Sequence, residues 1–137
     1  MMESSGVNYL AILVAGVAAW ILGAIWYAAP VFGNTWMQGI GKTKEQVEKD
    51  YSFMKMVWAL IGYLVAGYGI ARLLSFTLGD SLFDGVMIGL LGAVCLVAAP
   101  IAVNEIMEHR PPKLYFINAF YIIITFAVMG AIIGAWR

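Results

Sequence analysis

The polar side chains that could bind or react with a ligand are few and lie mainly in the second half of the chain. Asn104 and Glu108 are four residues apart, so they share one face of a helix, and Arg110 and Asn118 follow closely. An amide or a carboxylate in hydrocarbon needs a partner. We predict that these residues form a polar clasp between the third and fourth apolar segments, with a ligand or ion site as the alternative.

Catalytic patterns are missing from the sequence. His109 is the only histidine and lies in a short loop, so a histidine metal site or a catalytic triad would lack partners. Glu105 and Glu108 could act as paired carboxylates, but the neighbouring Arg110 favours an ion pair. We therefore expect no enzymatic activity, no metal site and no cofactor.

Aromatic rings offer a second arrangement, in which they would surround an apolar ligand while amide groups orient it. The residues that would line such a cavity are Trp20, Trp26, Tyr27, Asn104, Asn118 and Tyr121. The corresponding function would be a small transporter, a channel, or a membrane protein that binds a lipid or another small molecule.

The amino-acid composition predicts the environment in which these residues lie. Hydrophobic residues make up 63% of the 137 residues and charged residues 12%, whereas soluble domains carry about 25% charged residues. A soluble domain of this size could not bury so much apolar surface. The formal net charge is zero, which gives no reason to expect nucleic-acid binding. The chain is therefore predicted to lie in the lipid bilayer.

Four apolar segments are long enough to cross a bilayer, which takes about 20 helical residues. They cover about 7–29, 54–76, 85–103 and 114–136. The runs are continuous rather than alternating, which excludes a β-barrel. We predict one domain over 1–137, an all-α bundle of four transmembrane helices.

The segment after the first span predicts a change of direction. It reads GAIWYAAPVFGNTWM from Gly23 to Met37, and Pro30 should stop or kink the helix near Ala29 so that the chain turns along the membrane surface. Thr43 and Gln46 form a capping box. We expect a short interfacial helix from about residue 44 that runs into the second span.

Basic residues predict the orientation. Six flank the first and third loops: Lys42, Lys44, Lys49, Lys55, Arg110 and Lys113. Two, Arg72 and Arg137, lie on the opposite side. The positive-inside rule then places both termini outside the cytoplasm. The predicted location is a multi-pass protein of the bacterial inner (plasma) membrane.

Small residues recur at four-residue spacing on every span. The ridges are Ala15, Ala19 and Gly23; Gly62 and Ala66, with Gly67 and Ala71; Gly85, Gly89 and Ala93; and Gly130 and Gly134, with Ala127, Ala131 and Ala135. Such ridges let membrane helices pack closely. Our main hypothesis is a non-catalytic membrane protein that acts by helix packing, as a homo-oligomer or as an accessory or assembly subunit.

Three features also resemble a known family. These are the Gly23–Met37 stretch, the pattern of Asn104, Glu108 and Arg110, and the run INAFYIIITFAVMGAIIGAW from Ile117 to Trp136. In this combination the chain resembles the uncharacterised bacterial membrane family known as domain of unknown function 1761. The family often has serine after the tyrosine, where this chain has Ala28. The resemblance implies a four-helix integral membrane protein and supplies no activity.

Overall fold

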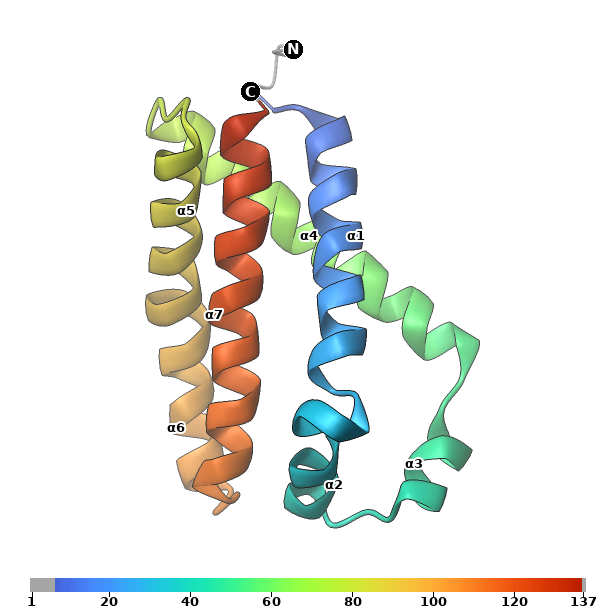
Figure 1. The fold of residues 1–137 in the computed structure, drawn as a ribbon. Helices are drawn as coiled ribbons and strands as arrows, with labels where there is room; N and C mark the ends of the chain where they lie inside the picture. Colours follow the sequence, from blue (N-terminus) through green and yellow to red (C-terminus); the bar gives the residue numbers. More distant parts are fainter. Residues whose placement is uncertain (1–6, 137) are drawn as a thin grey trace.

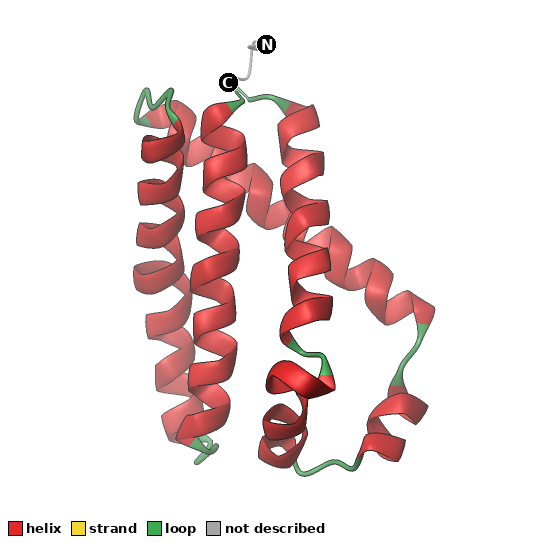
Figure 2. Ribbon diagram, viewed as in Figure 1, coloured by secondary structure: helices red, strands yellow, loops and turns green. Residues whose placement is uncertain are grey.

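The computed structural model describes residues 7–136, and this part of the chain is helical and contains no strand (Figures 1 and 2). The helices are α1 (Tyr9–Trp26), α2 (Asn34–Ile40), α3 (Lys44–Asp50), α4 (Phe53–Phe76), α5 (Leu82–Leu91), α6 (Ala99–Met107) and α7 (Pro112–Ala135). Two π-helical segments join some of them: η1 (Ala29–Gly33) and η2 (Gly92–Ala98).

Four helices are long and apolar enough to cross a membrane, as the sequence predicted: α1, α4, the continuous helix Leu82–Met107, and α7. The third span is longer than predicted at both ends. It begins earlier because Ser81 accepts a hydrogen bond from the Asp84 N–H and caps the helix. It ends later because the helix continues through Asn104 and Glu105 to Met107, and the chain turns at His109, which takes a left-handed conformation at φ 58°.

Two prolines lie at interruptions of the helices, and one of them, Pro30, lies where the sequence predicts such an interruption. Helix α1 ends at Trp26, and Pro30 lies in η1 rather than in a continuation of α1. Pro100 lacks an N–H and crowds the preceding turn, and the π-helical η2 lies directly before it. Wider turns of this kind are one way in which a helix accommodates such an interruption.

The first loop confirms one prediction and corrects another. Thr43 and Gln46 form the capping box, and α3 begins at Lys44. The helix does not run into the second span, because Tyr51 is extended and the Ser52 side chain caps a separate helix, α4. Thr43 caps the start of α3 and Ser52 caps the start of α4, so the expected single helix forms as two helices. Both short helices, α2 and α3, lie at the end of the molecule opposite to the start of α1 (Figure 1).

The spans form an uneven bundle. Helix α7 lies between α1 and the third span, whereas α4 runs diagonally behind α1 and α7 (Figure 1). The Asn8 side-chain nitrogen donates to the Trp136 carbonyl oxygen at 2.8 Å, so the start of α1 and the end of α7 share one end of the bundle. The first and third loops lie at the other end. This agrees with an even number of crossings, while the side facing the cytoplasm stays a prediction.

The interior of the bundle is small. In an 18-residue apolar stretch of each span, between 17% and 39% of the residues are buried, and the outward surface carries large apolar side chains. Ala11, Ala15 and Ala19 of α1 are fully buried against residues of α4 and α7, among them Leu74 and Met129. A surface of this composition matches contact with lipid chains rather than water.

Helices α5 and α7 meet backbone to backbone. A Cβ atom added to Gly85 would overlap the Gly130 carbonyl oxygen, and one added to Gly130 would overlap the Gly85 carbonyl oxygen. A Cβ atom added to Gly89 would likewise overlap the Phe126 carbonyl oxygen, and one added to Gly134 would overlap the carbonyl oxygen of Ser81, the residue that caps α5. The glycines among the small residues predicted to line these two helices therefore form a contact that only glycine permits.

Substitution of these glycines should destabilise the bundle. Gly85→Ala or Gly130→Ala should lower the free energy of unfolding by about 1–3 kcal/mol, because the added methyl group overlaps backbone that cannot rotate away. Gly92→Ala is the matched control on the same span, since the nearest atom would lie at 4.0 Å. Thermal and denaturant unfolding in detergent, followed by circular dichroism, measures the difference. Equal stability of the Gly85 and Gly92 variants would contradict the contact.

Candidate functional site

A cluster of hydroxyl, amide and aromatic groups joins three spans near the middle of the bundle. Tyr121 of α7, which is 3% exposed, lies at its centre. Its hydroxyl donates to the Ala19 carbonyl oxygen of α1 at 2.8 Å, and its oxygen lies 2.8 Å from the Tyr63 hydroxyl of α4. A phenol has one proton to give, so Tyr63 supplies the proton of the second bond. One side chain thus links α7 to both α1 and α4.

Room for Tyr121 comes from Gly23. A Cβ atom at Gly23 would lie 2.7 Å from the Tyr121 hydroxyl oxygen, so any larger residue would push the tyrosine away from Ala19. Gly23 follows Ala19 by one helical turn on the ridge that the sequence singled out. The small residues of α1 therefore make room for the Tyr121 side chain, whereas the glycines of α5 and α7 bring two backbones into contact.

The aromatic pair at the end of α1 bonds to α7. The Tyr27 hydroxyl donates to the Asn118 side-chain oxygen at 2.6 Å, and the Trp26 indole N–H donates to the Ile117 carbonyl oxygen at 3.1 Å. The Tyr27 and Tyr121 ring centroids are 5.3 Å apart, edge to face. These bonds satisfy polar groups where water is scarce. Because hydrogen bonds are directional, they also orient the end of the first span relative to α7.

Only some of the predicted site residues lie close together. Trp26, Tyr27, Asn118 and Tyr121 come together in the cluster just described. Trp20 is half-buried on α1, and its indole nitrogen is buried without a hydrogen-bond partner among the described residues.

Asn104, Glu108 and Arg110 lie apart from this cluster and are exposed around the end of α6. The expected clasp is therefore corrected: the bond of Asn118 links α7 to the end of the first span, not to the third span. The partner of Arg110 is Glu105, with the two side-chain atoms 3.4 Å apart. The turn at His109 folds the chain back, so that the Arg110 N–H bonds to the Glu105 carbonyl oxygen.

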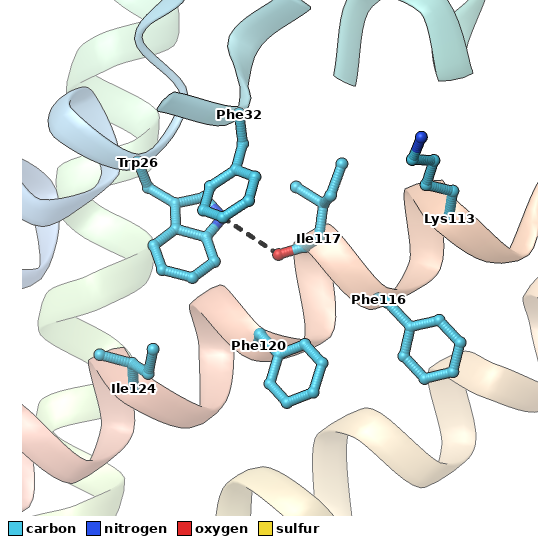
Figure 3. Close-up of a pocket in the computed structure, with 7 residues that line it drawn as sticks. All are labelled: Trp26, Phe32, Lys113, Phe116, Ile117, Phe120 and Ile124. Carbon is cyan, nitrogen blue, oxygen red and sulfur yellow. Dashed lines mark hydrogen bonds between the residues drawn. The ribbon is translucent and has the colours of Figure 1, made fainter. Parts of the chain in front are cut away.

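An apolar groove lies beside the cluster, with a volume of about 330 Å³ (Figure 3). Trp26 and Phe32, with ring centroids 4.6 Å apart, form one wall. The other wall and the floor come from one face of α7: Lys113, Phe116, Ile117, Phe120 and Ile124. Trp26 is the one predicted cavity residue that lines this groove.

Sequence reasoning missed the α7 side of the groove. Its residues are spaced by three or four along the chain, which is the pattern of one helix face and could have been recognised. What the pattern could not show is that Trp26 and Phe32 lie opposite to that face. Their position depends on η1, which turns the chain back toward α7 after α1 ends.

A family profile described as "Protein of unknown function (DUF1761)" matches residues 10–134. The chain belongs to this family. The match confirms the resemblance found in the sequence and covers the four spans except for one residue at each end, together with the polar cluster and the groove. No curated protein and no solved structure matches the chain. The family carries no assigned activity, so the function has to be argued from the geometry.

The two asparagines provide a test of the cluster. Asn118→Leu should lower the free energy of unfolding by about 1 kcal/mol, because it removes the bond from Tyr27. Asn104→Leu is the matched control and should leave stability unchanged or slightly raised, since Asn104 is exposed on an apolar span. Unfolding in detergent measures both. A larger loss of unfolding free energy for Asn104→Leu than for Asn118→Leu would instead support a clasp between the third and fourth spans.

Proposed function

We propose that this membrane protein is non-catalytic and acts by helix packing, as a homo-oligomer or as an accessory or assembly subunit of a membrane complex. The observation that carries the proposal is the outward face of α4. At Gly62 and Gly69 an added Cβ atom would meet nothing within 4 Å. Exposed large side chains on the same face are Trp58, Val65 and Phe76.

Glycine in a helix costs about 1 kcal/mol relative to alanine, so it needs a compensating contact. Gly85, Gly89 and Gly130 have that contact inside the chain. Gly62 and Gly69 do not, and they are seven residues apart on one face of α4. A helix from another chain would fit against them, as small residues allow close approach between membrane helices.

The placement of acidic groups supports a role without chemistry. The described acidic residues lie in the loops, in α3 and at the ends of the third span, and none lies in the middle of a span. Among the described residues no group of three histidine, cysteine or acidic side chains is placed to hold a metal ion. His109 is exposed in the turn after α6. These positions favour a packing role over proton transfer or metal chemistry.

The oligomeric state tests this proposal. In mild detergent and in lipid nanodiscs, the protein should form dimers or larger assemblies, or copurify with a defined membrane partner. Gly62→Leu and Gly69→Leu should each weaken that association at least severalfold, because leucine holds the facing helix away. Cys95→Leu is the control, since Cys95 is exposed on a different span.

Mass measurement by light scattering and cross-linking in the membrane provide the readout. A protein that stays strictly monomeric in both environments and copurifies with no partner would contradict the proposal. Equal association of the Gly62, Gly69 and Cys95 variants would show that α4 is not the contact.

A further inference from the structure

The groove beside Trp26 extends along α7 from Lys113 to Ile124 (Figure 3). Eleven residues of helix rise about 16 Å, roughly half of the hydrocarbon thickness of a bilayer. Lys113 lies in the first turn of α7, and Ile124 lies at the middle of the helix. With α7 spanning the bilayer, a groove of this length corresponds to about one leaflet, from the headgroup level to the midplane.

A second groove of about 240 Å³ lies on the other side of the same aromatic residues. Its lining includes Val94, Ala98 and Ala99 of the third span, and it shares Phe116 and Phe120 with the first groove. The rings of Phe116 and Phe120 are stacked with centroids 6.2 Å apart, and both are about half exposed. Two apolar grooves thus flank one aromatic ridge, which consists of Phe116 and Phe120.

Charge is placed at one end of this arrangement. Lys113 lies at the outer end of the first groove and lines it with its carbon atoms, so that its ammonium group lies beside an otherwise apolar lining (Figure 3). The described residues contain no carboxylate within ion-pair distance of Lys113, whereas Arg110 is engaged by Glu105. The first turn of α7 adds the positive end of a helix dipole. An anionic group at the headgroup level would be attracted there.

We propose that this surface is a binding site for one anionic diacyl phospholipid, which straddles the Phe116–Phe120 ridge. One acyl chain lies in the groove walled by Trp26 and Phe32, and the other lies in the groove beside Ala99. The phosphate lies next to Lys113. Two apolar grooves with a cation at the head select a two-chain anionic lipid over a single-chain or zwitterionic one. This site is separate from the α4 face and does not depend on self-association.

The test compares three probes by native mass spectrometry of the purified full chain: phosphatidylglycerol, phosphatidylcholine with the same acyl chains, and lysophosphatidylglycerol with one chain. Phosphatidylglycerol should bind most tightly. Lys113→Gln should weaken its binding about fivefold, the contribution of one basic residue near an anionic headgroup, and leave phosphatidylcholine unchanged. Lys55→Gln is the matched control, because it removes an exposed cation at the start of α4, away from both grooves.

Filling the second groove tests the two-chain geometry. Ala99→Phe should lower the affinity for diacyl phosphatidylglycerol and leave that for the one-chain lipid unchanged, because Ala99 is exposed and lines only that groove. Val94→Phe is a second variant with the same expectation, and unfolding measurements confirm that both are folded.

Three results of the binding measurements would overturn the proposal. These are equal binding of the two diacyl lipids, equal effects of Lys113→Gln and Lys55→Gln, and no effect of either groove-filling variant. A dimer that is lost in Ala99→Phe while no lipid is bound would assign the groove to a second copy of the chain and also overturn it.

Discussion

The contact between the backbones of α5 and α7 is the constraint on which the rest of the structure depends. Lipid tails are as apolar as leucine, so burying apolar side chains gives little driving force for helix association inside a bilayer. The helices must gain stability from close contact and from hydrogen bonds that lipid cannot provide. At Gly85 and Gly130 the approach is so close that no side chain would fit between the helices. This contact fixes the third span against α7 in rotation and in register.

Helix α7 then organises the remaining spans. Its opposite side carries Ile117, Asn118 and Tyr121, which bond to the end of the first span, to Ala19 of α1 and to Tyr63 of α4. The same helix presents the Phe116–Phe120 ridge to the outside, with a groove on each side. One helix therefore holds the bundle together and presents the proposed lipid site, while the outward face of α4 stays available for another chain.

The number and approximate limits of the spans could be predicted because they depend on the length of apolar runs and on local signals such as Pro30 and Thr43. The pairing of side chains could not. Gly62 and Gly85 show the same four-residue spacing of small residues, yet only Gly85 meets a facing backbone. Asn118 was expected to face the third span and instead bonds to Tyr27. Both outcomes depend on how each helix is rotated and on which helices are neighbours, and the spacing of residues along one helix does not reveal either.

The most direct test of this account is a double-mutant cycle between positions 85 and 130. Gly85→Ala, Gly130→Ala and the double variant would be compared by their free energies of unfolding in detergent. If the two glycines touch, each alanine changes the cost of the other, and the coupling should be about 0.5–3 kcal/mol. Additivity within about 0.3–0.5 kcal/mol would show that the two positions are independent, and the account of α7 as the organising helix would be wrong.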